Sequence, residues 1–320
     1  MDQLERFWDA VEAFWDRLSA VHPGALALAL GFHVLNLALR AVGWRTILRA
    51  AYPGARVRWR SAFGAYVAGV GINGVVPARA GDVVKLLLIH RRVEGSTYPA
   101  LASGLVVETL FDLPVALVLV GWAWWSGVVP HFSLPDLPAF DLSWMADHPL
   151  ATGIAVILLI GAVAAAVVVY GGHARAFWDR VGQGVAVLRT PRRYLAGVAL
   201  PQALGWCCRL ASAYCFLAAF GLAATWSGAL LVLAVGAVAT AMPLTPGGLG
   251  PKQALLVVVL AGQAGAGAVL AFSVGMEAAV LVTNLVLGLS AMAVMLGGLR
   301  FRKAIAEARA EQARTGRPVG

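Results

Sequence analysis

Long apolar runs dominate the chain and determine which elements it predicts. Continuous apolar segments cover residues 24–46, 98–127, 149–171, 195–221 and 268–299. A helix needs about 20 mostly apolar residues to cross the hydrocarbon core of a bilayer. A transmembrane barrel would instead show short segments of alternating polarity. The pattern therefore predicts an all-α, polytopic integral membrane bundle.

Two further apolar stretches are interrupted. Residues 61–90 break between Pro77 and Gly81, and residues 228–262 break between Pro246 and Gly250. Each half is shorter than a comfortable span. We interpret each stretch as a re-entrant hairpin of two half-helices that meet near the middle of the bilayer. Two short full spans would satisfy the same topology and remain the alternative.

The N-terminal segment has a different, amphipathic pattern. Its apolar positions recur at helical spacing on one face, between Leu4 and Leu18, and acidic residues occupy much of the other face. This pattern predicts an interfacial helix that lies on the membrane, and it does not resemble a cleavable signal peptide.

Composition and charge support a membrane location and give it an orientation. The chain is 60% hydrophobic and 13% charged, with a formal net charge of +9. The basic residues gather in 40–60, 85–92, 172–193 and 300–317, whereas 128–148, 222–227 and 263–267 contain no Lys or Arg. The positive-inside rule then predicts a cell (inner or cytoplasmic) membrane protein with its N-terminus outside and its C-terminus in the cytoplasm. Because this rule accounts for the basic charge, we expect no nucleic-acid partner.

The two halves of the chain share a spacing. At a constant offset of 169 residues, the following pairs match: Arg40 with Arg209, Pro77 with Pro246, Gly81 with Gly250, and Glu108 with Glu277. The charge pattern gives the two halves opposite orientations. Inverted repeats with broken helices at corresponding positions are typical of transporters with a midplane site.

This relation predicts a single transmembrane domain made of two inverted repeats, each with one re-entrant hairpin. The first repeat covers about 1–148, and the helix 149–171 supplies the crossing that inverts the second copy. The second repeat covers about 172–300, followed by a basic cytoplasmic tail at 301–320.

The first break carries charges beside its proline and glycine. Pro77 ends a half-helix, Gly81 permits a close approach, and Arg79, Asp82 and Lys85 follow within one and a half turns. Charges at this depth are costly and mark pathways or ligand sites. The structural alternative is that Asp82 caps the helix and pairs with Arg79 or Lys85.

The second break is rich in glycine. Pro246, Gly247, Gly248 and Gly250 precede Lys252. Glycines before a helix can expose backbone N–H groups to an anion, and Lys252 adds a positive charge. The alternative is a structural turn with Lys252 reaching outward.

Three acidic residues lie inside apolar segments. Glu108 and Asp112 are four residues apart and so share a helix face, and Glu277 lies in another segment. Such acids pair with bases, bind a cation or carry a proton. Their candidate basic partners are Arg40, Arg79, Lys85 and Arg209.

Signatures of enzymes, metals and cofactors are missing from the sequence. There is no metalloprotease, serine-hydrolase or P-loop motif, and the six histidines form no ligand pair at helical spacing. The three cysteines, Cys207, Cys208 and Cys215, fall in one apolar segment and are expected to be core residues. We therefore expect no metal, no cofactor and no enzymatic activity.

The motifs together resemble the flippase-like membrane domain of the lysylphosphatidylglycerol synthases. The resemblance covers roughly 20–300 and rests on residues 73–82, on Glu108 and Asp112, and on residues 245–250. The sequence departs from the family pattern at Lys85, at Thr109 and at residues 251–253. No soluble synthase domain is expected in the 20 residues after the last apolar segment, so the chain is not expected to make lysylphosphatidylglycerol alone.

The resemblance implies a flippase that moves a phospholipid or lipid-linked molecule between leaflets, with an anionic lipid phosphate as substrate. The expected substrate-binding residues are Arg79, Asp82, Lys85, Glu108, Asp112, Arg209, Gly247, Gly248, Lys252 and Glu277. The expected hinge residues are Asn73, Pro77, Gly81, Pro246 and Gly250. The alternatives are a membrane-embedded transferase on a lipid-phosphate carrier and a scaffold for lipid synthesis. Membrane lipids are the expected partners, and a homo-oligomer is possible.

Overall fold

The computed structural model describes residues 20–76, 79–125, 171–241, 251–260 and 264–315. The predicted interfacial helix, the linking helix 149–171, and Pro77, Pro246, Gly247, Gly248 and Gly250 lie outside these residues. The described chain is helical throughout. Its helices are α2 (Pro23–Ala51), α3 (Trp59–Asn73), α4 (Ala80–His90), α5 (Tyr98–Trp125), α8 (Gly171–Gly184), α9 (Pro191–Tyr194), α10 (Leu200–Ala219), α11 (Trp226–Ala241), α12 (Pro251–Val259) and α13 (Ala266–Thr315). A 3₁₀ turn at Ala186–Arg189 and a π-helical turn at Leu195–Ala199 flank α9.

Three of the described helices are long and apolar enough to cross a membrane. They are Pro23–Ala51, Tyr98–Leu119 and Ala266–Gly297. The segment expected at 195–221 forms helix α10, but it is not among these three, because Gln202 and Arg209 lower its hydropathy. The expectation that this segment is a fully apolar span was therefore wrong in its composition, although the helix is present.

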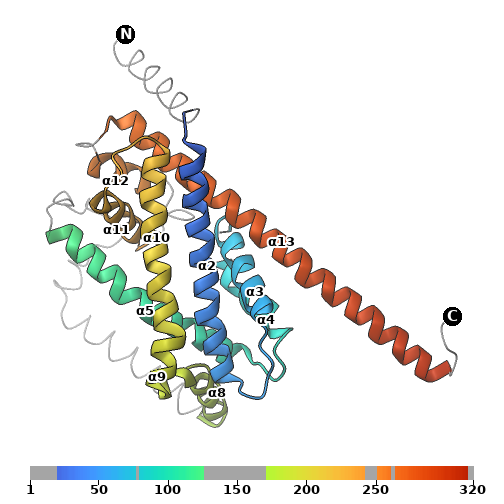
Figure 1. The fold of residues 1–320 in the computed structure, drawn as a ribbon. Helices are drawn as coiled ribbons and strands as arrows, with labels where there is room; N and C mark the ends of the chain where they lie inside the picture. The colour runs from blue at the N-terminus through green and yellow to red at the C-terminus, as the bar shows by residue number, and fades with distance from the viewer. Residues whose placement is uncertain (1–19, 77–78, 126–170, 242–250, 261–263, 316–320) are drawn as a thin grey trace, which may run out of the picture.

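Helices α2 and α10 form an antiparallel pair at the centre of the bundle (Figure 1). The backbone N–H of His22 donates to the carbonyl of Ala219 at 2.8 Å, and the Ser212 hydroxyl donates to the carbonyl of Ala29 at 2.8 Å. The start of α2 therefore lies beside the end of α10. The arginine-rich loop after α2 lies at the opposite end, near α8 and α9.

The first interrupted segment folds as two short antiparallel helices, α3 and α4. Asn73 at the end of α3 accepts a 2.7 Å hydrogen bond from the backbone of Gly81 at the start of α4. A methyl group at Gly81 would overlap the carbonyl oxygen of Gly69, so only glycine permits this approach. The second interrupted segment also gives two short helices, α11 and α12, and Lys252 on α12 lies against Gly236 on α11.

Apolar packing is divided between the two halves. One core cluster is built mainly from α2, α3, α4 and α5, with Trp44 and Leu101 fully buried in it. The other is built mainly from α10 to α13 and includes Phe216 and Phe272. The charged cavity described below lies where α2, α5 and α10 meet the hairpin of α3 and α4.

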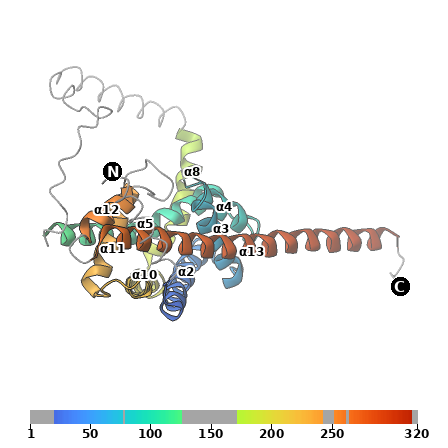
Figure 2. The same cartoon turned by 90° about the horizontal axis from the view of Figure 1, so that it is seen from above.

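Helix α13 is much longer than its apolar part. It continues without a break to Thr315 and projects beyond the other helices (Figures 1 and 2). The sequence predicted an apolar segment ending at 299 and a separate basic tail at 301–320. The helix continues because residues 300–315 contain no glycine or proline before the last helical residue.

Candidate functional site

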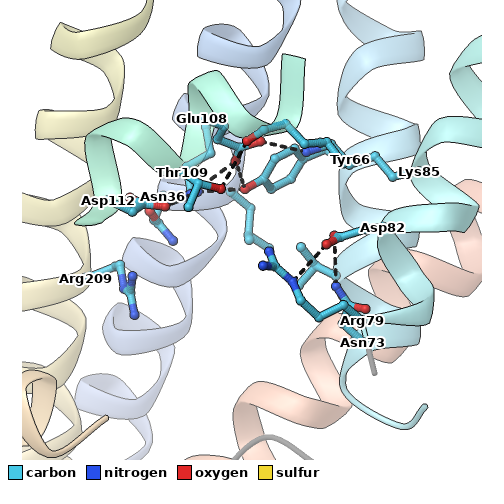
Figure 3. Close-up of a pocket in the computed structure, with 14 residues that line it drawn as sticks. Asn36, Tyr66, Asn73, Arg79, Asp82, Lys85, Glu108, Thr109, Asp112 and Arg209 are labelled. Carbon is cyan, nitrogen blue, oxygen red and sulfur yellow. Dashed lines mark hydrogen bonds and ion pairs between the residues drawn. The ribbon is translucent and has the colours of Figure 1, made fainter. Parts of the chain in front are cut away.

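A charged cavity of about 270 Å³ opens between α2, α3, α4, α5 and α10. Figure 3 shows its labelled side chains converging from these helices on one space. Its polar lining residues are Asn36, Arg40, Tyr66, Asn73, Arg79, Asp82, Lys85, Glu108, Thr109, Asp112 and Arg209. Six residues of the predicted substrate site are thus brought together, along with the predicted hinge residue Asn73.

Glu108 is the centre of a buried network. Its Oε2 accepts a hydrogen bond from Lys85 Nζ at 2.9 Å, and its Oε1 accepts one from Arg40 Nη2 at 3.1 Å. The hydroxyl of Tyr66 donates to the same Oε1 at 2.7 Å. The side chains of Lys85 and Glu108 are only 6% and 8% exposed. A carboxylate held by two cations and a hydroxyl is arranged as an ion-pair partner rather than as a free proton carrier.

Asp112 extends this network along the same face of α5. Arg40 Nη1 donates to Asp112 Oδ1 at 3.0 Å, and Arg40 Nη2 donates to Oδ2. The indole of Trp206 on α10 also donates to Oδ1, at 3.1 Å. The bidentate pair fixes both the guanidinium and the carboxylate, and it connects the first half of the chain to α10.

The ammonium of Lys85 is also stabilised by aromatic rings. Its Nζ lies 4.2 Å from the ring centre of Trp44 and 4.1 Å from that of Tyr66. Cation–π contacts of this kind compensate part of the cost of removing a charge from water. Lys85 is therefore held in place by one carboxylate and two rings.

The N-terminal end of α4 holds a second, more open pair. Arg79 Nε lies 2.9 Å from Asp82 Oδ2, and Asn73 Nδ2 donates to Asp82 Oδ1 at 3.2 Å. The side chain of Arg79 is 77% exposed, in contrast to the buried network. Arg79 has a φ of 57°, a left-handed conformation that is strained for any residue other than glycine.

Arg209 differs from the other cations of the cavity. Its guanidinium lies 4.3 Å from the ring of Trp206, and among the described residues it has no carboxylate within ion-pair distance. The described lining holds four cations and three carboxylates. The excess positive charge is therefore located at Arg209.

The remaining charged site residues lie elsewhere. Lys252 on α12 pairs with Glu277 on α13, and neither residue lines the cavity. Their side chains are 17% and 25% exposed, so this pair is wetter than that of Lys85 and Glu108. The glycines at 247 and 248, predicted as anion ligands, lie outside the described residues.

Several cavity residues were not singled out from the sequence. Tyr66, Trp44 and Trp206 look like ordinary aromatic residues of apolar segments, and only the tertiary contacts give them polar roles. Asn36 is buried and its Oδ1 has no hydrogen-bond partner in the described structure. A signal for Asn36 existed, because it is a polar side chain in the middle of an apolar span.

Fold and site together define a polytopic helical membrane protein with an internal charged cavity. The sequence profile of the lysylphosphatidylglycerol synthase transmembrane region matches residues 7–307. The chain therefore belongs to this family, as its motifs predicted. The family indicates a role connected with membrane lipids.

A curated relative gives a second comparison. The chain is 27% identical over 283 residues to a protein of Haloferax volcanii named glycosyltransferase AglD. The alignment covers 77% of this chain and 45% of the relative. The chain thus spans about half the length of that protein, so the relative's activity does not transfer to it directly.

Proposed function

We propose that the protein is a flippase that moves a phospholipid or lipid-linked molecule between the leaflets of the cell membrane. The observation that carries this proposal is the charged cavity inside an otherwise apolar bundle, with one arginine that has no carboxylate partner. Buried charges in a membrane protein are expensive and are retained where a pathway or ligand needs them.

The lipid phosphate is the group that this cavity suits best. Arg209 offers a guanidinium fork without a competing carboxylate, and the exposed Arg79 offers another at the hairpin tip. Guanidinium groups bind phosphate oxygens in a bidentate manner. The acyl chains would remain in lipid, beside apolar side chains of α4 and α5 that are exposed, such as Val83 and Leu110.

The two helical hairpins would provide the moving parts. In each half, a lysine on the second short helix pairs with a glutamate on the following long helix, Lys85 with Glu108 and Lys252 with Glu277. This parallel supports the inverted repeat and the re-entrant depth that the sequence predicts. Alternating access would follow from rocking one half against the other around a fixed site.

The orientation proposal places the arginine-rich end of the bundle in the cytoplasm. Single cysteines at Arg56 and Thr225, in a chain whose native cysteines are replaced, report the two ends. An impermeant thiol reagent added to intact cells should label Thr225→Cys and leave Arg56→Cys unlabelled. Labelling of both from the same side would refute the topology and the inversion.

Translocation in vesicles tests the function directly. The purified chain is reconstituted with a fluorescent phospholipid, and transfer is followed by quenching the outer leaflet. Arg209→Gln should slow transfer at least tenfold, as expected when a charged group that binds ligand is lost, whereas Arg180→Gln, an exposed arginine on α8, should not. Transfer no faster than in empty vesicles for the unmodified chain, with every lipid tried, would contradict the proposal.

Two further variants examine the hairpin tips. Arg79→Ala and Lys252→Ala should both reduce translocation while the chain remains folded. Normal transfer by both variants would remove these residues from the pathway. Loss of folding would instead assign them a structural role.

The name of the Haloferax relative supports a transferase as the second candidate. Such an activity needs a free acid or base near the lipid phosphate. In the described part of the cavity, Asp82, Glu108 and Asp112 are all engaged by donors. Incubation with a polyprenyl phosphate and a nucleotide sugar, followed by lipid extraction, would detect a glycosylated product.

A further inference from the structure

The loop between α2 and α3 gathers arginines at one end of the bundle, away from the charged cavity. We call this group the arginine cradle, and it comprises Arg45, Arg49, Arg56, Arg58, Arg60 and Arg193. Within the described structure, none of the six forms an ion pair with a carboxylate. Unpaired arginines this close together repel one another, so the arrangement is electrostatically suited to an anion.

The cradle is hollowed rather than flat. One hollow of about 590 Å³ is lined by residues 56–60 and Arg45, and an adjoining one of about 510 Å³ is lined by residues 52–57 with Arg45, Arg49 and Arg193. They share Arg45 and Arg56. No acidic residue lines either hollow. The positive-inside rule requires only basic residues on this side, and it does not require them to enclose a space.

The loop is anchored at both of its ends. Arg45 Nε donates to the carbonyl of Val57 at 3.0 Å, and the Val57 side chain is buried in the first apolar core. The Tyr52 hydroxyl accepts a 3.1 Å hydrogen bond from the backbone N–H of Thr97. A preformed loop lowers the entropy that a ligand must overcome. The terminal N–H groups of Arg45 are left to face the hollows.

An aromatic pair indicates which kind of anion the cradle meets. Trp59 and Phe63 stack with ring centres 4.8 Å apart and an interplanar angle of 8°. Trp59 lines the first hollow and is 38% exposed. Tryptophan is enriched at the level of lipid headgroups, where one part of the ring is apolar and another is hydrated. A site with arginines on one side and this ring on the other fits a lipid better than a free anion.

We propose that the arginine cradle binds the phosphate headgroup of an anionic phospholipid in the leaflet at this end of the bundle. Arg56, Arg58 and Arg60 would contact the phosphate, and Trp59 would lie beside the glycerol and the first acyl carbons. This site is separate from the transport cavity, with which it shares no lining residue. The proposal does not depend on translocation.

Lipid binding to the full-length chain in detergent tests it, with native mass spectrometry as the readout. Phosphatidylglycerol and phosphatidylcholine with identical acyl chains are titrated against the unmodified protein, which should prefer the anionic lipid. The variant R56Q/R58Q/R60Q should bind phosphatidylglycerol about 10- to 100-fold more weakly, given the contribution of each arginine near a lipid surface. The matched control R91Q/R180Q/R189Q removes the same charge from exposed arginines outside the cradle and should bind like the unmodified protein.

The outcomes separate a built site from a general field. Equal losses in both triple variants, or no preference for phosphatidylglycerol, would overturn the proposal. Displacement of the lipid by inorganic phosphate at a comparable concentration would also overturn it, because the site would then take the free anion. If the triple variant does not fold, Arg58→Gln alone should weaken binding several-fold. Translocation is measured separately, so a failure of the transport proposal does not affect this result.

Discussion

The two halves of the bundle solve the same problem to different extents. In the first half, the lysine of a short helix meets a glutamate inside a network that also holds Arg40, Tyr66 and Asp112. In the second half, Lys252 and Glu277 pair at a wetter position. Glu108 and Glu277 each follow the proline of their break by 31 residues, since 108 − 77 and 277 − 246 are equal.

This difference separates what a repeat conserves from what it elaborates. The lysine–glutamate pair occurs in both halves, so it is tied to the hairpin geometry. The additional arginine, hydroxyl and aromatic partners occur around Glu108 alone in the described residues. A buried network with this many partners is rigid and fails when one member is lost. We therefore expect the first half to hold the structure fixed and the second half to be easier to move.

The largest expected effect is that of Glu108→Ala. The change leaves Arg40 and Lys85 buried against each other without their shared carboxylate. Loss of one partner of a buried charge network costs roughly 3–5 kcal/mol. Thermal unfolding in detergent should therefore show a large fall in Tm, whereas Thr109→Val, at the exposed neighbouring position, should leave Tm nearly unchanged. A small change for Glu108→Ala would mean that the network does not stabilise the fold.

Gly81→Ala should come next. The added methyl group would overlap the Gly69 carbonyl oxygen and the Asn73 side chain, so α3 and α4 would have to separate. Overpacking of this kind costs about 1–3 kcal/mol. Gly31→Ala is the matched control, because nothing lies within 4 Å of its added methyl group. Equal stability of the two variants would show that the hairpin crossing is looser than described.

Lys252→Ala should destabilise the chain less than Glu108→Ala, by roughly 1–2 kcal/mol, because water can reach both members of the second pair. A double-mutant cycle with Glu277→Ala measures the coupling directly. The same cycle on Lys85 and Glu108 should give the larger coupling. If the second pair couples as strongly as the first, the proposed contrast between the halves is wrong.

The smallest effect on stability is expected at the hairpin tip. Arg79→Gly removes the left-handed strain but also the exposed ion pair with Asp82, and each term is about 1 kcal/mol or less. Arg79→Ala loses the pair and keeps the strain. The glycine variant should therefore have a Tm higher than the alanine variant by an amount equal to about 1 kcal/mol. An opposite order would show that Arg79 does not hold this conformation in solution.

Much of the fold could be predicted from the apolar pattern. Its run lengths predicted the spans of α2, α5 and α13, and its two breaks predicted the pairs of short helices. The family followed from the motifs at 73–82 and 245–250 with the intramembrane acids. The pattern failed at the end of α13, because helix propensity continues past the last apolar residue and hydropathy does not report it.

The sequence by itself therefore determined which residues must be in lipid, where the chain is broken, and which charges are too costly to be accidental. It left open whether Glu108 pairs or carries a proton, and it named Arg40, Arg79, Lys85 and Arg209 as equal candidate partners. Only the tertiary structure decided this, by bringing Arg40 and Lys85 to Glu108 and leaving Arg209 beside a ring. The reason is physical: hydropathy is a sum over neighbours along the chain, whereas an ion pair depends on distances between helices that are far apart in it.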